Sequence, residues 1–466
     1  MADQYDLVVV GGGPGGYAAA FYGASAGLNV ALVEKDTIGG TCLNRGCIPA
    51  KAFLETAAAR RHAEHAADFG IDVTVGATDF VVAQARKQKI VDGLVKGLTG
   101  LVKVKKVTYL LGVGALNADN SVTVTAEDGT VTQVKGDAVI LAAGSVPRVI
   151  PGFEPGGPVM TSDEVLMLDR IPARIAVIGG GAIGCEFAST FADLGSQVTI
   201  LEGLPKILPG LDADLANVVV RSFQKKKIDI KTGVAVKGHT PTGSGSTVLS
   251  FGEGETLEVD AVIVSVGRRP FADQLGLGNT KVAVSDRGFV EVDEYCATSV
   301  DGVYAIGDLI NTPQLAHVAY AEAILVVQQL LGENAIPVDY DRVPWAIYCS
   351  PEVAWAGPGE EAAKAAGYDV VVAKHQFRAN SRAMILGEID GLVKIIAKKN
   401  PDGSAGQVLG VHMVGPWVTE QLSGGYLAVN WEATVDEIAH FIQPHPSLSE
   451  LFGETVMSLT GRSINS

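Results

Sequence analysis

Residues Leu7–Gly16 read LVVVGGGPGG, and this stretch decides the fold of the chain. Its apolar opening is typical of a β-strand buried on both faces, and the glycines follow with the spacing Gly11-x-Gly13-x-x-Gly16. An alanine-rich helical stretch and a second apolar run come next, ending at Glu34, eighteen residues beyond Gly16. This order predicts a dinucleotide site, in which glycines let the backbone approach a pyrophosphate and the acid binds ribose hydroxyls.

The same pattern recurs in the middle of the chain. The apolar run Ile175–Ile178 leads into Gly179-x-Gly181-x-x-Gly184, and Glu202 again lies eighteen residues beyond the last glycine. Two fingerprints predict two bound dinucleotides. Because the Glu202 carboxylate would repel a 2′-phosphate, the second site is expected to prefer NAD over NADP. The alternative interpretation of Glu202 is a surface carboxylate that merely follows a strand.

Between the fingerprints, the segment GGTCLNRGCIPAK carries Cys42 and Cys47 in a small-residue loop that runs into a helical segment with Lys51. A five-residue offset on a regular helix turns two side chains about 140° apart, so a disulfide here needs a distorted turn, which Gly46 permits. A short, strained, accessible disulfide is easily reduced and re-formed. Two buried free thiols, or half of a metal site, are alternatives that the pair alone leaves open.

Composition narrows the function. A chain of 466 residues is too long for one core, and its formal charge of −16 argues against binding to nucleic acid or to an anionic membrane. We expect no signal peptide and no membrane span, because no apolar run reaches about 18 residues. The five cysteines are few and odd in number, which suits a reducing cytoplasm. His62 and His65 have no third ligand cluster nearby, so no metal site is predicted.

Taken together, these motifs resemble those of the flavoprotein disulfide reductases, the class I pyridine nucleotide-disulfide oxidoreductases, and within them the dihydrolipoamide dehydrogenases. The resemblance covers nearly the whole chain and includes VGRRP, AIGD, LAH, ANSRA and HPSLSE in addition to the segments above. It implies an α/β fold with two Rossmann-like dinucleotide-binding domains and a C-terminal α+β dimerisation domain. The expected divisions are 1–148 (FAD), 149–270 (NAD), 271–343 (completing the FAD site) and 344–466 (interface).

The resemblance also implies roles for particular residues. Cys42 matches the outer thiol that exchanges with a lipoyl disulfide, and Cys47 the inner thiol that contacts the flavin. His445 matches the base and Glu450 the carboxylate that orients it, both supplied by the other subunit of a homodimer. Lys51 and Glu186 resemble an ion pair beside the flavin N5. Expected FAD positions are Gly11, Gly13, Gly16, Glu34, Lys35, Gly40, Thr41, Lys51, Gly144, Asp308 and Ala316; expected NAD positions are Gly179, Gly181, Gly184, Glu202 and Gly267.

The implied reaction is oxidation of protein-bound dihydrolipoamide through a Cys42–Cys47 disulfide and FAD, with reduction of NAD. The lipoyl group is expected on another chain, a lipoyl-bearing protein of a 2-oxo-acid dehydrogenase complex. Two other interpretations compete with this one. The chain is then either another disulfide reductase of the glutathione or mercuric type, or a catalytically silent dimer that acts as a scaffold or redox sensor. Glu202 and the absence of a C-terminal cysteine pair count against the former.

Some positions depart from the family pattern. Arg45 lies between the two cysteines where an apolar residue is usual, and we hypothesise that it lowers a thiol pKa by favouring the thiolate. A solvated Arg45 side chain is the alternative. Trp345 and Trp355 stand where smaller residues are usual. The remaining departures are Ala50, Ala143, Gln443 and Pro444.

Overall fold

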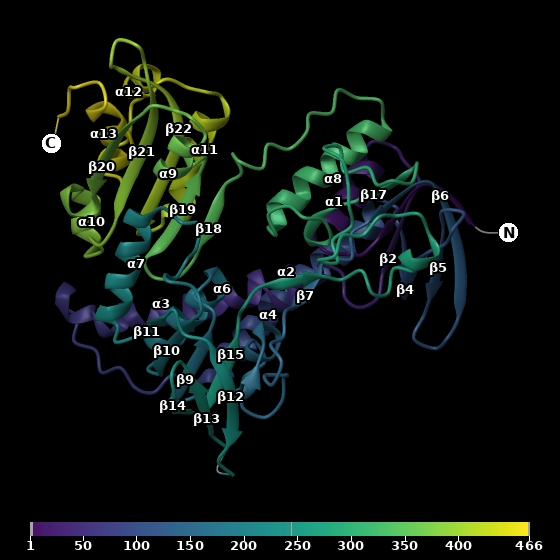
Figure 1. Ribbon diagram of the computed structural model, residues 1–466, viewed down its shortest axis with the longest axis horizontal. Helices are drawn as coiled ribbons and strands as arrows, with labels where there is room; N and C mark the ends of the chain where they lie inside the picture. Colours follow the sequence, from purple (N-terminus) through teal and green to yellow (C-terminus); the bar gives the residue numbers. More distant parts are fainter. Residues whose placement is uncertain (1–2, 244, 465–466) are drawn as a thin grey trace.

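The computed structural model describes residues 3–243 and 245–464. Figure 1 shows the chain gathered around separate sheets: one at the right, beside helices α1 (Pro14–Ser25) and α8 (Ala316–Leu330), one below, and a C-terminal one at the upper left. The mixed α/β architecture that the sequence predicts is confirmed.

The first sheet has the strand order β3-β2-β1-β6-β5-β4, and β17 pairs with β6. The pairs among β1, β2, β3, β6 and β17 are parallel, whereas β4, β5 and β6 pair antiparallel. Because parallel strands are covered on both faces, β2 is buried along its whole length. The bounds are β1 (Asp3–Val10), β2 (Val30–Glu34), β3 (Thr108–Leu111), β4 (Val113–Leu116), β5 (Ser121–Thr125), β6 (Val131–Leu141) and β17 (Val303–Ala305).

The second sheet has the order β11-β10-β9-β15-β8 and is parallel throughout. An antiparallel sheet of order β12-β13-β14 follows β11 in the chain, and β7 pairs with β16. The bounds are β7 (Ser145–Pro147), β8 (Val159–Met160), β9 (Arg174–Ile178), β10 (Gln197–Glu202), β11 (Asp229–Thr232), β12 (Val236–Pro241), β13 (Thr247–Phe251), β14 (Glu255–Val259), β15 (Ala261–Val264) and β16 (Arg268–Pro270).

Helices α2, α3, α4 and α6 pack together near the centre of the molecule, whereas α1 lies beside α8 at the first sheet (Figure 1). Helix α7 lies between the second sheet and the C-terminal sheet. The bounds are α2 (Gly40–Arg45), α3 (Cys47–Glu64), α4 (Phe80–Val104), α6 (Ala182–Asp193) and α7 (Ala213–Lys225).

The C-terminal sheet is antiparallel, with the order β18-β19-β22-β21-β20, and is covered by α11 (Val418–Asn430) and α13 (Glu450–Ser458). Its bounds are β18 (Trp345–Ile347), β19 (Glu352–Ala356), β20 (Val370–Gln376), β21 (Leu392–Lys399) and β22 (Ala405–Gly415), with α9 (Glu360–Ala365) between β19 and β20.

One apolar core joins the second sheet to the C-terminal sheet. It contains Phe80 of α4 and Phe191 of α6, whose ring centroids are 6.4 Å apart, together with Ile347 and Val414 from the C-terminal sheet. Phe191 is 1% exposed. This packing fixes α6, which begins in the second fingerprint, against the rest of the molecule.

Two further observations bear on function classes. Among residues 3–243 and 245–464, no helix combines the length and apolar character that crossing a membrane requires. Within the same ranges, no cluster of three or more His, Cys, Asp or Glu side chains is arranged to hold a metal ion.

We predict that Phe191→Ala lowers the free energy of unfolding by about 3–5 kcal/mol, because it opens a cavity in this shared core. Chemical denaturation monitors the change. Val81→Ala is the matched control: Val81 is 62% exposed on α4, so its change is expected within about 0.5 kcal/mol of zero. Equal effects of the two substitutions would contradict the assignment of Phe191 to the core.

Candidate active site

The first fingerprint packs a tight turn against β1 and β2. Gly11 has φ +109°, which favours glycine, and its amide donates to the Val33 carbonyl at 2.8 Å. A Cβ on Gly16 would lie 1.7 Å from the Gly11 carbonyl oxygen, so only glycine lets α1 approach the strand. The α1 N-terminus, with its free backbone amides, therefore faces the end of the sheet.

The second fingerprint repeats this geometry almost atom for atom. Gly179 has φ +105°, its amide donates to Leu201, and a Cβ on Gly184 would lie 1.9 Å from the Gly179 carbonyl oxygen. The chain thus builds two equivalent turn-to-helix junctions, one on each parallel sheet.

The acids at the strand ends are also equivalent. Glu34 accepts a 2.6 Å hydrogen bond from the Gly12 amide, and Glu202 accepts one of the same length from the Gly180 amide. Both residues are buried, at 7% and 8% exposed. The surface-carboxylate interpretation of Glu202 is therefore wrong, because that side chain is held inside its fingerprint turn.

The cysteines lie at a break between two helices. Cys42 is in the short helix α2, where the sequence suggested a loop, and Cys47 begins α3. Between the helices Gly46 has φ −146° and ψ −111°, and a Cβ there would lie 2.9 Å from the Thr41 carbonyl oxygen. Gly46 thus permits the distortion that brings the two side chains together. Both cysteines are free thiols in this structure.

The two thiols differ in acidity. The hydrogen bond between them lowers the pKa of Cys47 and raises the pKa of Cys42. Burial opposes the shift at Cys47, the positive charge of Lys51 favours its thiolate, and its pKa is about 7. The pair therefore shares one proton near neutral pH, with Cys47 as thiolate and Cys42 as donor.

The hypothesis that Arg45 activates a thiol is wrong. Its guanidinium pairs with the carboxylate of Asp36 on the surface, and both side chains are substantially exposed. The nearby cation that lowers the thiol pKa values is Lys51, one turn into α3.

Lys51 joins three parts of the chain. Its Nζ donates to both carboxylate oxygens of Glu186 on α6, at 2.9 and 2.8 Å, and the Tyr348 amide donates to the same carboxylate at 2.9 Å. Burial lowers the pKa of Lys51, but Glu186 offsets that effect and the pKa is raised overall. Lys51 is thus a fixed positive charge beside Cys47.

A single cleft of about 1480 Å³ collects most of the predicted site. Gly16 and Gly184 do not line it, because their role in the structure is helix–strand packing. The predicted residues that do line it are Gly11, Gly13, Glu34, Lys35, Gly40, Thr41, Cys42, Cys47, Lys51, Gly144, Gly179, Gly181, Glu186, Glu202, Gly267, Asp308 and Ala316.

His445 and Glu450 do not line this cleft. They form a pair of their own at the start of α13, where His445 Nδ1 lies 2.8 Å from Glu450 Oε1. The other Glu450 oxygen accepts from the Ser447 amide at 2.7 Å, so the carboxylate is fixed. The imidazole is 73% exposed, which leaves its Nε2 open to a second molecule.

Sequence reasoning missed three hydrogen bonds at and near the site. Asp308 accepts a 2.5 Å hydrogen bond from the Ser145 hydroxyl, and Arg268 donates to the same hydroxyl at 2.7 Å. Near the thiols, the hydroxyls of Tyr17 and Tyr320 are hydrogen-bonded to each other, and burial raises the pKa of Tyr17. Tyr17 directly follows Gly16, but no local pattern links it to Tyr320 on α8.

Comparison with known proteins places this geometry in a family. Residues 5–323 match the family model described as pyridine nucleotide-disulphide oxidoreductase, and residues 343–456 match the dimerisation domain of that family. The chain is 39% identical to a dihydrolipoyl dehydrogenase of Bacillus subtilis, with 100% of both chains covered. It is 40% identical to a dihydrolipoyl dehydrogenase of Trypanosoma brucei brucei, with 99% of this chain and 98% of the relative covered.

A solved structure has the same fold. The crystal structure of LpdA from Mycobacterium tuberculosis superposes with a TM-score of 0.92 at 26% identity, covering 98% of this chain and 100% of the other. The chain belongs to the pyridine nucleotide-disulphide oxidoreductases.

We predict that Lys51→Met raises the pKa of Cys47 by about one unit, because it removes the nearby positive charge. Iodoacetamide alkylation of Cys47 in the reduced protein, located by mass spectrometry, should have a midpoint at about pH 7 in the wild type and a higher one in the variant. Arg45→Met should leave the midpoint unchanged. A shift with Arg45→Met, or none with Lys51→Met, would overturn this account of the thiols.

Proposed function

We propose that this protein catalyses the oxidation of protein-bound dihydrolipoamide to lipoamide, with FAD as cofactor and NAD as electron acceptor. One observation carries the proposal: the thiol pair and the Lys51–Glu186 ion pair line the same cleft as both dinucleotide fingerprints. Electrons from a dithiol thereby have a route to a nicotinamide. The names of the full-length relatives agree with this activity.

The residues of the first fingerprint fit FAD. Backbones approach so closely that a Cβ on Gly40 would lie 2.6 Å from the Gly13 Cα, which leaves the cleft lined by main chain beside the α1 N-terminus, as a pyrophosphate requires. Asp308 and Ala316 would hold the remainder of the cofactor. When bound, FAD would supply two-electron redox chemistry between the thiol pair and the nicotinamide.

The fingerprint at Gly179–Gly184 would bind NAD. The Glu202 carboxylate lines the cleft within the turn, where it would repel a 2′-phosphate, and this supports NAD over NADP.

Residues of the chain itself have separate roles in the thiol–disulfide exchange. His445 takes a proton from one substrate thiol, and the resulting thiolate attacks Cys42 of a Cys42–Cys47 disulfide. The bond between the cysteines breaks, and Cys47 leaves as a thiolate stabilised by Lys51. The second substrate thiol then displaces Cys42 from the mixed disulfide and closes the lipoyl ring; its proton passes to Cys42, which leaves as a thiol, while His445 keeps the first proton. Two electrons have moved from substrate to the cysteines, and Glu450 stabilises the imidazolium.

This chemistry needs two subunits. His445 does not line the cleft of its own chain, while the match to the dimerisation domain covers residues 343–456. We infer a homodimer in which His445 and Glu450 of the partner subunit complete each site. The four divisions 1–148, 149–270, 271–343 and 344–466 then correspond to FAD, NAD, central and interface domains.

The substrate is a lipoyl group on another protein, as in a 2-oxo-acid dehydrogenase complex. The net charge of −16 suits a partner with a basic docking patch. A cytoplasmic location fits a redox pair in a chain with few cysteines.

We predict that the purified protein reduces NAD with dihydrolipoamide and, in reverse, oxidises NADH with lipoamide. Initial rates with NADPH should be lower by about 10²-fold or more, because the buried Glu202 disfavours the 2′-phosphate. Rates with oxidised glutathione should be lower by a similar factor, because the proposed substrate is a lipoyl group. Preference for NADPH with glutathione would instead support the glutathione-reductase alternative. Failure of NADH to bleach bound FAD under anaerobic conditions would support a silent scaffold.

We further predict that the active site is shared between subunits. His445→Gln and Cys47→Ser homodimers should each lose about 10²–10⁴-fold in dihydrolipoamide oxidation, because each lacks the base or the inner thiol at every site. A heterodimer of the two, purified with two different affinity tags, should regain about half of the wild-type rate, because one of its sites is intact. If the base acted within its own subunit, the heterodimer would stay inactive.

A further inference from the structure

A row of side chains crosses one face of the C-terminal sheet. The strand register places Trp345 opposite Trp355, Trp355 opposite His412, His412 opposite Lys394, and Lys394 opposite Lys374. Side chains directly opposite each other in antiparallel strands share a face. At one end the two tryptophans stack with ring centroids 5.3 Å apart and line the cleft. The row therefore runs from the dinucleotide cleft to α7.

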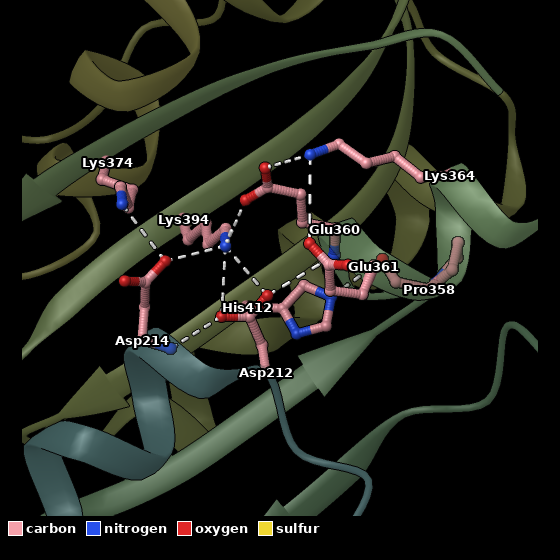
Figure 2. Close-up of polar contacts among 9 residues, drawn as sticks. All are labelled: Asp212, Asp214, Pro358, Glu360, Glu361, Lys364, Lys374, Lys394 and His412. Carbon is pink, nitrogen blue, oxygen red and sulfur yellow. Dashed lines mark hydrogen bonds and ion pairs between the residues drawn. The ribbon is translucent and has the colours of Figure 1, made fainter.

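Lys394 connects this row to two helices outside the sheet. Its side chain is 2% exposed, and its Nζ lies 2.9 Å from Asp212, 2.8 Å from Asp214 and 2.8 Å from Glu360 (Figure 2). Asp212 and Asp214 come from the start of α7, whereas Glu360 comes from α9 of the C-terminal part. The buried ammonium of Lys394 thus ties helix α7 to the C-terminal sheet through ion pairs.

The histidine beside Lys394 does not add charge to the cluster. His412 is 2% exposed, burial lowers its pKa to about 4, and its Nε2 lies 3.0 Å from the Pro358 carbonyl oxygen. The imidazole is therefore neutral and donates to that carbonyl at physiological pH. The other two lysines lie at the exposed edge of this cluster. Lys374 contacts Asp214 at 3.2 Å, and Lys364 contacts Glu360 at 2.7 Å (Figure 2).

Asp212 connects this cluster to a segment that lines the cleft. It is the N-cap of α7, where its carboxylate accepts from the Asp214 amide at 3.0 Å. It directly follows the segment 203–211, which we call the cleft loop and which begins directly after Glu202. Leu204, Leu208 and Leu211 of this loop line the cleft.

The other end of the cleft loop is tied to the second fingerprint. Glu202 accepts hydrogen bonds from the amides of Gly180 and Leu204, and the Leu208 amide donates to the Gly180 carbonyl at 2.7 Å. Leu208 has φ +51°, an uncommon conformation for a leucine that the surrounding contacts must hold. The loop is therefore fixed by the fingerprint at one end and by Lys394, through Asp212, at the other.

We propose that Lys394 is a positioning residue for NAD, which holds the cleft loop against the second fingerprint by clamping Asp212. The proposal rests on the proposed function only in taking the second fingerprint as the NAD site. It assigns the C-terminal sheet a role in nucleotide binding, in addition to any role in dimerisation. Lys394 itself does not line the cleft, so it acts through the loop and not by contact with the nucleotide.

The test compares NAD binding to oxidised, FAD-loaded protein by calorimetry. Lys394→Met should weaken NAD binding roughly five- to ten-fold, at the lower end of the usual range for coupling between sites. Asp212→Asn keeps the α7 cap and should weaken binding in the same direction by a smaller factor. Lys374→Met is the matched control, because Lys374 contacts Asp214 at the exposed edge of the cluster and should leave the dissociation constant unchanged.

Two further readouts separate positioning from general damage. Flavin reduction by dihydrolipoamide in the absence of NAD should keep its wild-type rate in the variants, whereas hydrogen exchange should accelerate in residues 203–211. If Lys394→Met does not fold, Asp212→Asn decides the question. Unchanged NAD affinity in a folded variant overturns the proposal, as does equal weakening by Lys374→Met. A wild-type protein that binds NAD but does not oxidise dihydrolipoamide overturns the proposed function alone.

Discussion

The rest of the site depends on the interactions of the Glu186 carboxylate. It accepts Lys51 from the helix that follows the cysteines and the Tyr348 amide from the entry to the C-terminal sheet, while it stands on the helix of the second fingerprint. A buried carboxylate must be paired, so each of these partners is held in place by the same charge. The thiols, the second dinucleotide site and the C-terminal part are thereby fixed relative to one another.

The duplicated turn explains why so much of the fold could be predicted. Strand, glycines, helix, strand and acid are consecutive in sequence, and the close contact of Gly16 with Gly11 recurs between Gly184 and Gly179. Local order dictates these contacts, because no other residue type fits there. The positions of Glu34 and Glu202 followed from the same pattern, and the structure adds that both carboxylates hold their own turns closed.

What could not be predicted depends on non-local geometry. The partner of Arg45 is Asp36, and nothing in the spacing reveals this ion pair. The pairing of Tyr17 with Tyr320 and the row from Trp345 to Lys374 depend on helix packing and on strand register, which a single sequence leaves open. The His445–Glu450 pair was predictable as a motif, but its position outside the cleft could be seen only in the fold.

The polarity of the thiol pair shows which of the two thiols needs a base. Lys51 and the hydrogen bond from Cys42 stabilise a thiolate at Cys47, which leaves the proton on Cys42. A thiol attacks a disulfide only after it has lost its proton, so exchange with a substrate needs an acceptor on the Cys42 side. The cleft side is occupied by Lys51, a cation, which cannot serve as that acceptor. An exposed imidazole oriented by a fixed carboxylate has the required chemistry, and His445 is such a group, outside the cleft of its own chain.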